Sequence, residues 1–370
     1  METMRTGWGR VLLAGVVLQG MLVAAAGADE IRKGCEDADG KTVWYDGQEL
    51  PIEGRAFKDT ESYYDRLPGR AQATVPASVW GLSHNSAGMA LRFVSDTAEF
   101  KVRWTVRNAG LAMPHMPATG VSGVDVYARL PGGWRFVKNG RPVAVTNVMD
   151  FTLAANTECL VYLPLYNGTA KIEVGIPKGK TIAAAPPRAN GLTRPVVFYG
   201  TSITQGGCAS RPGLAFTAVA GRLIDAPVVN LGFSGNGKME MALCDLLAEI
   251  DASVYVLDCL WNMPDALVRE RAEPFIRALR ARRPGTPILL AEDCNVFERA
   301  PTSKALLLRG IYDKLKAEDA ALWQNLHYLE AKEMLGHDSE GTVDGCHPND
   351  LGMWRQGLVF GKALEKIVKP

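Results

Sequence analysis

The sequence lacks the compact motifs of common metal and redox sites. Its seven cysteines include no Cys-x-x-Cys pair, which excludes zinc-ribbon and thioredoxin-like functions. Its five histidines form no His-Glu-x-x-His pattern or comparable group, so spacing gives no support for metal-dependent hydrolysis. The formal net charge of +1 leaves no basic footprint, which argues against nucleic acid as a partner.

The sequence also has little that could span a membrane. Its one long apolar run, residues 11–26, is shorter than the ~20 residues that a bilayer requires. Arg5 and Arg10 precede this run, and Ala26-Gly27-Ala28 ends it with small residues, as in a secretory signal. We therefore predict a signal peptide over residues 1–28, cleaved after Ala28, rather than an uncleaved anchor. The mature protein is expected to be secreted or periplasmic, without stable membrane insertion.

A chain of 370 residues is long enough for two domains, and its two parts differ in pattern. Residues 31 to about 182 contain short alternating runs separated by Gly, Asn, Asp and Pro, which is typical of a β-sandwich or barrel. The runs are Ala90–Val94, Glu99–Val106, Gly123–Tyr127, Gly133–Val137 and Lys171–Gly175. We predict an N-terminal β domain over residues 29–182, a linker over 183–193 and a second domain over 194–370.

From Pro195 onward, strands alternate with helices. The expected strands are Val196–Tyr199, Val228–Leu231, Val254–Asp258, Ile288–Ala291 and His327–Leu329. Apolar residues at helical spacing lie between them, and a last helix is expected from about Asp350 to Ile367. This alternation predicts an α/β fold in which a parallel sheet is flanked by helices.

A serine follows the first of these strands, in Gly200-Thr201-Ser202, where a helix is expected to begin. Ligands of open α/β sheets bind beyond the carboxyl ends of the strands, and a helix N-terminus there favours negative charge. Ser202 is therefore a candidate nucleophile whose backbone N–H could stabilise an oxyanion. Taken alone, a serine in this position is more often a helix cap.

Loops after the later strands contain the residue types that such a nucleophile needs. His347 can take the proton of Ser202, and Asp344, three residues earlier, can hold the imidazole. Gly235 and Asn262 can donate N–H groups to an oxyanion. Each of these residues alone is more often part of an ordinary turn or loop hydrogen bond. Their joint placement at one edge of the sheet predicts a serine hydrolase.

These residues resemble, in order, the four signature blocks of the SGNH (GDSL-like) esterases and acylhydrolases. The resemblance covers about residues 194–370 and rests on Gly200-Thr201-Ser202, Asn230 through Gly235, Asn262 and Asp344-x-x-His347. Upstream, Gly123-Val124-Asp125-Val126-Tyr127 is similar to the Gly-x-Asp-Leu-Tyr signature of the β domain that precedes the catalytic domain in one bacterial subgroup.

The resemblance implies a flavodoxin-like parallel sheet flanked by helices and preceded by a jelly-roll-like β-sandwich. It implies Ser202 as nucleophile, Gly235 and Asn262 as oxyanion donors, His347 as base and Asp344 as its partner. Such a mechanism needs no metal or organic cofactor. The sequence departs from the family where Gly-x-Asn-Asp is replaced by Leu260-Trp261-Asn262-Met263, which weakens the assignment of Asn262 and predicts an apolar pocket wall from Trp261 and Met263.

Two other mechanisms have weaker support in the sequence. Gly232-x-x-x-x-Gly237-Lys238 nearly matches a phosphate-binding loop, but Met239 stands where a serine or threonine must bind magnesium. Cys208 and Cys346 lie near the proposed catalytic residues in the sequence, and a catalytic cysteine is less favoured than Ser202.

We predict an esterase that hydrolyses small acyl esters, acetyl esters above all, on a small molecule or an oligosaccharide. The alternatives are a lipase- or thioesterase-type acylhydrolase and a non-catalytic carbohydrate-binding protein on the same fold. The candidates for substrate contact are Phe233, Trp261, Trp80 and His84, and a second group contains Met113, His115, Met116 and Asp125. Such residues more often serve in packing. The sequence leaves the oligomeric state and any disulfide pairing open.

Overall fold

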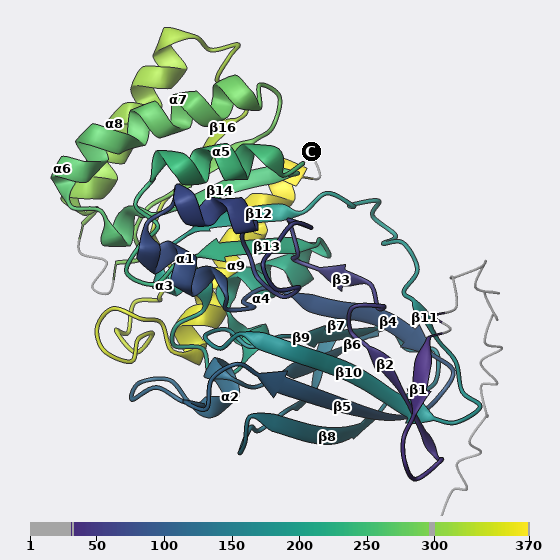
Figure 1. The fold of residues 1–370 in the computed structure, drawn as a ribbon. Helices are drawn as coiled ribbons and strands as arrows, with labels where there is room; N and C mark the ends of the chain where they lie inside the picture. Colours follow the sequence, from purple (N-terminus) through teal and green to yellow (C-terminus); the bar gives the residue numbers. More distant parts are fainter. Residues whose placement is uncertain (1–30, 32, 296–299, 369–370) are drawn as a thin grey trace, which may run out of the picture.

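A computed structural model describes residues 31, 33–295 and 300–368 of the protein. The predicted signal peptide, residues 1–28, lies outside the described residues. Figure 1 shows two parts, an antiparallel β part from the first half of the chain and an α/β part from the second half. Within the described residues, none of the helices combines the length and apolar character that crossing a membrane requires.

The N-terminal part is a sandwich of two antiparallel sheets whose inner faces share one core. Strands alternate in burial, so that Phe100, Val102 and Trp104 point inward from a single strand. One sheet has the order β1 (Gly34–Glu36), β2 (Thr42–Asp46), β10 (Thr169–Pro177), β5 (Glu99–Val106) and β8 (Thr146–Thr152). The other has the order β11 (Ile182–Ala184), β4 (Ala90–Ser95), β9 (Cys159–Tyr162), β6 (Asp125–Leu130) and β7 (Gly133–Asn139), with β3 (Ile52–Glu53) beside β4.

The second part is built on a five-stranded parallel sheet. Its order is β13 (Val228–Gly232), β12 (Val196–Gly200), β14 (Val254–Asp258), β15 (Ile288–Ala291) and β16 (Leu326–Leu329). Numbered along the chain, this is the 2-1-3-4-5 order of flavodoxin-like sheets. The structure therefore confirms the predicted fold class, a flavodoxin-like parallel sheet preceded by a β-sandwich.

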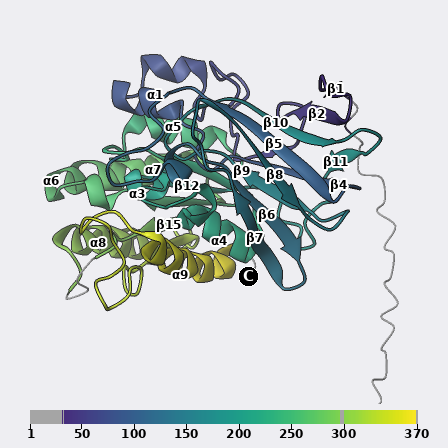
Figure 2. The same ribbon diagram turned by 90° about the horizontal axis from the view of Figure 1, so that it is seen from below.

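Helices cover both faces of the parallel sheet, as Figure 2 shows. Successive strand residues point to opposite faces, so Phe198 packs into one core and Tyr199 into the other. One face is covered by α4 (Phe216–Ile224) and α9 (Asp350–Val368), and the other by α5 (Met241–Glu249), α7 (Glu273–Arg282) and α8 (Ser303–Glu318). The short helices are α1 (Ala77–Ser83), α2 (Ala118–Val121), α3 (Ser202–Gln205) and α6 (Asp265–Leu267).

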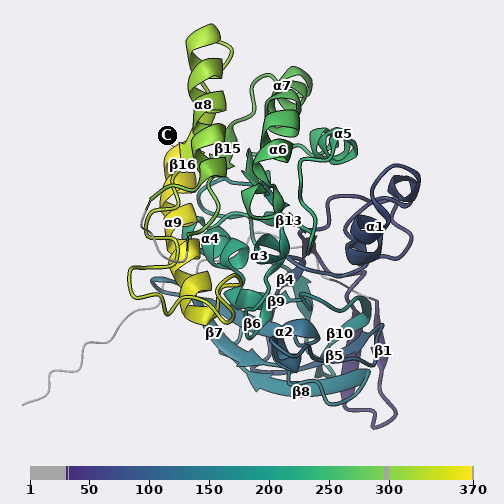
Figure 3. The same cartoon turned by 90° about the vertical axis from the view of Figure 1, so that its left-hand side faces the viewer.

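The two parts do not separate at the predicted boundary. β11 extends through residue 184, so the first two residues of the predicted linker belong to a strand. Further upstream, Phe57, Leu67 and Val79 pack into the core that contains Tyr199 of the parallel sheet. This places α1 beside α5 of the second part, although the strands that flank it in sequence belong to the sandwich (Figure 3). A segment of the first half is thus part of the second core.

Arg66 ties this segment to the parallel sheet. The residue is 2% exposed, and its guanidinium donates to four backbone carbonyls. Two belong to its own segment, Leu82 (2.7 Å) and Asn85 (2.8 Å). The other two belong to β13, Asn230 (3.2 Å) and Gly232 (2.6 Å). Because β13 leads into a predicted oxyanion loop, Arg66 holds the base of that loop in place.

Candidate active site

The turn after β12 places Ser202 at the start of α3, at the carboxyl edge of the sheet. Thr201 caps this helix, since its Oγ1 accepts a hydrogen bond from the N–H of Ile203 at 3.3 Å. Gly200 is needed because a Cβ there would lie 2.1 Å from Thr204 Oγ1. The capping role that a serine often fills is therefore taken by Thr201, which leaves the Ser202 hydroxyl available for chemistry.

The loop before α9 brings His347 and Asp344 to this serine. Ser202 Oγ and His347 Nε2 are hydrogen-bonded at 3.0 Å, and His347 Nδ1 and Asp344 Oδ2 at 2.8 Å. The other carboxylate oxygen of Asp344 accepts from the backbone N–H groups of Cys346 (3.0 Å) and His347 (2.7 Å). The structure thus joins the three predicted side chains in one hydrogen-bonded chain.

Hydrogen bonds within this loop shift the pKa of both ionisable groups. Partial burial opposes ionisation of Asp344, but hydrogen bonds from the His347 backbone and imidazole and from the Cys346 N–H lower its pKa to about 2. The Cys346 side chain, followed by Asp344, raises the pKa of His347 above its ordinary value of 6.5, against the effect of burial. An ionised Asp344 favours the tautomer with its proton on Nδ1, which directs the Nε2 lone pair toward Ser202.

The predicted oxyanion donors lie on two neighbouring loops. Gly235, after β13, has a φ of +68°, a left-handed conformation that glycine adopts without strain. Apart from Gly235 and its two chain neighbours, no described residue has a heavy atom within 4 Å of the position that a Cβ would take there, so this residue faces open space. Asn262 ends a 3-10 turn after β14, and its Nδ2 donates to the Asn236 carbonyl at 2.8 Å. This bond fastens the two donor loops to each other.

Sequence reasoning missed the network that supports the nucleophile from inside. Gln205, fully buried at the end of α3, donates from Nε2 to Asn85 Oδ1 (3.0 Å) and to the Leu165 carbonyl (3.2 Å). Its Oε1 accepts from the backbone N–H of Ser234 at 3.0 Å. One side chain therefore connects the Ser202 helix, the Gly235 loop and the N-terminal part. Its only local signal is a polar residue directly after the Ser202 turn.

Two further groups beneath Ser202 were also missed. The hydroxyl of Tyr166, from the N-terminal part, donates to the Ser202 carbonyl at 3.0 Å. Asp258, at the end of β14, accepts a hydrogen bond from Thr204 Oγ1 at 2.7 Å, and burial raises its pKa to about 6. No spacing in the sequence links either residue to Ser202, because both contacts depend on the assembled fold.

The structure corrects two of the predicted substrate contacts. Phe233 is fully buried, with the Arg66 guanidinium 4.7 Å from its ring centroid, so it belongs to the core and not to a pocket. Met263 is also fully buried and forms no pocket wall. Phe233 directly follows β13 and Met263 follows the 3-10 turn after β14, and at both places the apolar side chain is directed inward. Trp261 is half-buried beside Asn262, with Lys304 Nζ 5.4 Å from its ring centroid, and remains a candidate.

Trp80 and His84 serve in packing. Their rings meet edge to face with centroids 4.9 Å apart, and His84 Nδ1 is hydrogen-bonded to the buried carboxylate of Asp65 at 2.9 Å. Within the described part of the chain, no hydrogen bond or ring contact joins either residue to Ser202 or His347. The structure therefore does not bring this pair to the site.

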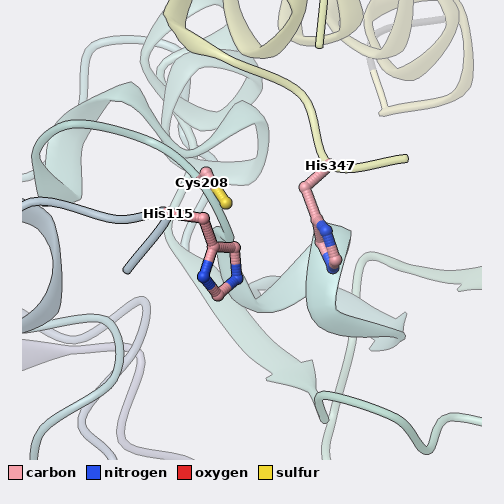
Figure 4. A group of neighbouring side chains, drawn as sticks. All are labelled: His115, Cys208 and His347. Carbon is pink, nitrogen blue, oxygen red and sulfur yellow. The ribbon is translucent and has the colours of Figure 1, made fainter. Parts of the chain in front are cut away.

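A residue of the second predicted group does reach the site. The ring of His115 is exposed, with its centroid 5.6 Å from that of His347 (Figure 4). Cys208 lies buried beside them, and burial raises the pKa of its thiol to about 11, which disfavours a thiolate nucleophile. All seven cysteines of the chain are free. Sequence spacing could not pair His115 with His347, because the contact crosses from one part of the molecule to the other.

Known proteins share both parts of this architecture. The GDSL-like lipase/acylhydrolase family profile matches residues 193–365, and the profile of the GxDLY N-terminus of SGNH hydrolase-type esterases matches residues 42–182. A solved structure from Bacteroides ovatus ATCC 8483, described as a GDSL-like lipase, is 32% identical with a TM-score of 0.76, and the alignment covers 89% of this chain and 98% of that one. A comparison with curated proteins found no match.

Two more distant structures share the fold. A salicylyl-acyltransferase from a tetracycline biosynthetic pathway is 19% identical with a TM-score of 0.64, over 86% of this chain and 93% of that one. A family two carbohydrate esterase from Cellvibrio japonicus is 11% identical with a TM-score of 0.57, over 88% and 98%. At these identities the likeness concerns the arrangement of the chain alone.

Proposed function

This chain belongs to the GDSL-like lipase/acylhydrolase family, and we propose that it is a secreted serine esterase that removes a small acyl group, acetyl above all, from a carbohydrate. The observation that carries the hydrolase assignment is the hydrogen-bonded chain Asp344–His347–Ser202 at the carboxyl edge of the parallel sheet. Secretion rests on the sequence pattern of residues 1–28.

The geometry fits acyl transfer through a covalent intermediate. His347 Nε2 takes the proton as Ser202 Oγ attacks the ester carbonyl, and Asp344 stabilises the imidazolium. The developing oxyanion accepts from the backbone N–H groups of Ser202 and Gly235 and from the second N–H of the Asn262 amide. Each such donor contributes about 3 kcal/mol to stabilisation of the transition state. His347 returns its proton to the leaving alcohol and then activates a water that releases the acid.

Packing around the nucleophile favours a small acyl group. Ser202 is only 5% exposed, and such a buried nucleophile favours a compact group at the reacting carbonyl. Phe233 and Met263, which are apolar residues on the flanking loops, are buried in the core and cannot line a groove for the acyl chain. A long acyl chain would need a groove lined by residues of this kind.

A carbohydrate is the alcohol component that we favour. Trp261 is half-buried next to Asn262, where an indole can stack on a sugar ring. The fold is shared with a carbohydrate esterase from Cellvibrio japonicus, which agrees with this substrate class. A lipase- or thioesterase-type activity is the alternative among hydrolases.

Hydrolysis of a matched substrate panel tests the proposal. Purified protein is assayed on 4-nitrophenyl esters of increasing acyl length, on an acyl thioester and on acetylated oligosaccharides. We expect the acetyl ester to give the highest kcat/KM, acetate release from an acetylated oligosaccharide, and loss of both in Ser202→Ala. Preference for long acyl chains or thioesters would replace the acetylesterase proposal. Sugar binding without hydrolysis, unchanged in Ser202→Ala, would identify a non-catalytic binding protein.

A further inference from the structure

His115, Cys208 and His347 bring three metal-binding side chains together beside Ser202 (Figure 4). One ligand atom from each residue lies within 4.8 Å of the other two. Imidazole nitrogen and thiolate sulfur are the ligands that zinc prefers, and three protein ligands with one open position make a recognised type of zinc site. No sequence motif indicates this group, since the three residues come from distant segments.

His347 already has the surroundings of a metal ligand. Its Nδ1 is hydrogen-bonded to the Asp344 carboxylate at 2.8 Å, as in the carboxylate–histidine–zinc arrangement that orients ligating imidazoles. Its Nε2 is the nitrogen left for a metal, and this nitrogen lies 3.0 Å from Ser202 Oγ. An ion on Nε2 would therefore occupy the atom that must accept the serine proton.

The segments that carry the three ligands are fastened to one another. The Cys208 N–H donates to the Pro348 carbonyl, next to His347, at 3.2 Å. The His115 turn is closed by two backbone hydrogen bonds between Met113 and Met116, at 2.9 and 3.2 Å. A few residues on, Thr119 Oγ1 donates to the Ser210 carbonyl at 2.5 Å, which anchors this region to the Cys208 loop. The side chain of His115 is exposed and can rotate to adjust the site.

We propose that His115, Cys208 and His347 form an inhibitory zinc site. Zn²⁺ binds one nitrogen of His115, Nε2 of His347 and Sγ of Cys208, whose thiol proton passes to solvent as the Zn–S bond forms. Water or Ser202 Oγ fills the fourth position. The metal takes the lone pair that would accept the Ser202 proton, so zinc binding and acyl transfer exclude each other. The protein is then an esterase that works without a metal and is switched off by one.

A second group of possible ligands shares the same histidine. Asp344, Cys346 and His347 also offer atoms within 4.8 Å of one another. A metal held there through Nδ1 would have to break the Asp344–His347 hydrogen bond, which the carboxylate and the loop backbone both support. A metal held by the His115 group through Nε2 would leave that hydrogen bond intact, and for this reason we favour the His115 group. Substitution of Cys346 separates the two sites experimentally.

Zinc inhibition of matched variants tests the proposal. The wild type, His115→Ala and Cys208→Ala are titrated with ZnCl2, each normalised to its own rate in EDTA, with His337→Ala and Cys35→Ala as histidine and cysteine controls. EDTA is expected to reverse inhibition of the wild type. His115→Ala and Cys208→Ala should each weaken inhibition by at least about tenfold, because loss of residues that merely orient a ligand costs about 10–100-fold in metal affinity. A wild type that zinc does not inhibit, or ligand variants that zinc inhibits as strongly as the wild type, would overturn the proposal.

This inhibition assay rests on the proposed esterase function, so a second readout is independent of activity. Ser202→Ala is titrated with Co²⁺, which reports a thiolate ligand by charge-transfer absorption. The band is expected in Ser202→Ala and absent when Cys208→Ala is added. A band that survives loss of Cys208 but disappears with Cys346→Ala would assign the metal to the other group and overturn the proposal. A Cys208-dependent band in a protein that hydrolyses no ester would uphold the metal site while the esterase proposal fails.

Discussion

The two sides of the candidate active site are held in different ways. On one side, Ser202 is 5% exposed and Gln205 fully buried, and Tyr166 and Asn85 connect them to the N-terminal part. On the other side, the Asp344 side chain is 39% exposed, and its hydrogen bonds stay within its own loop. Residues on the nucleophile side therefore contribute both to catalysis and to the stability of the fold, whereas residues on the base side contribute to catalysis and little to stability.

The largest effect is expected on the exposed side. His347→Ala removes the base, and we expect kcat/KM for an aryl acetate to fall by about 10³-fold or more. The midpoint of urea unfolding should change little, because only the Ser202 hydroxyl and one Asp344 oxygen lose a partner, and Asp344 keeps its two backbone donors. Kinetics and urea unfolding curves of the same preparation check the fall in kcat/KM and the nearly unchanged unfolding midpoint. A loss of stability in His347→Ala as large as that of a core substitution would contradict the claim that the base side contributes little to stability.

On the buried side, Arg66→Met should act on stability. It leaves the four carbonyls that Arg66 serves without their donor, and each unsatisfied buried group costs about 1–3 kcal/mol. We expect the free energy of unfolding to fall by about 3 kcal/mol or more. The matched control is Arg282→Met, which removes an exposed ion pair with Asp245 and should cost at most about 1 kcal/mol. Equal losses in both variants would contradict the role assigned to Arg66.

Tyr166→Phe removes a single oxygen atom and tests whether one group on the nucleophile side contributes to both stability and catalysis. It removes the hydroxyl that donates to the Ser202 carbonyl and should lower the free energy of unfolding by about 1 kcal/mol. Because this bond positions the nucleophile, kcat should fall by about tenfold while KM stays near the wild-type value. Steady-state kinetics measure kcat and KM separately, with Tyr312→Phe, on α8, as the control variant. A change in KM alone would assign Tyr166 to substrate binding.

The smallest expected effect is a shift in pH dependence. His347 must be neutral to accept the serine proton, and its pKa is raised, so activity should rise with pH through that raised pKa and be lost below it. Asp344, whose pKa is lowered, stays ionised throughout this range. Cys346→Ala should move the rising limb of kcat/KM, measured in EDTA, to lower pH without changing stability. If the rising limb of kcat/KM does not move, Cys346 is not the cause of the raised pKa of His347.

Much of the fold could be predicted because the parallel strands are short, apolar and bounded by clear breaks. The ends of β14 and β15 agree with the expectation to the residue. The sandwich was harder to predict in detail. β9 is buried at all four positions and shows no alternation, so no period marks it as a strand. Residues such as Phe57 and Leu67 join the second core through irregular segments, and local patterns carry no information about such packing.

The residues of the candidate site also fall into those that local sequence patterns predict and those that they do not. Ser202, Asp344 and His347 could be found because parallel strands deliver their following loops to one edge of the sheet. Phe233 was misplaced, since an aromatic residue after a strand can point to either side of a turn. The pairing of His115 with His347 depends on a contact between the two parts of the molecule, which spacing along the chain cannot express.

The central claim is that Ser202 carries the acyl group during turnover. The most direct test is rapid acid quenching of the protein with an aryl acetate, followed by intact-mass and peptide mass spectrometry. We predict one acetyl group per chain within the first turnover, located on the peptide that contains Ser202 and absent in Ser202→Ala. An acetyl group on Cys208 or Cys346, or full turnover with no acylated protein at any time, would contradict the account.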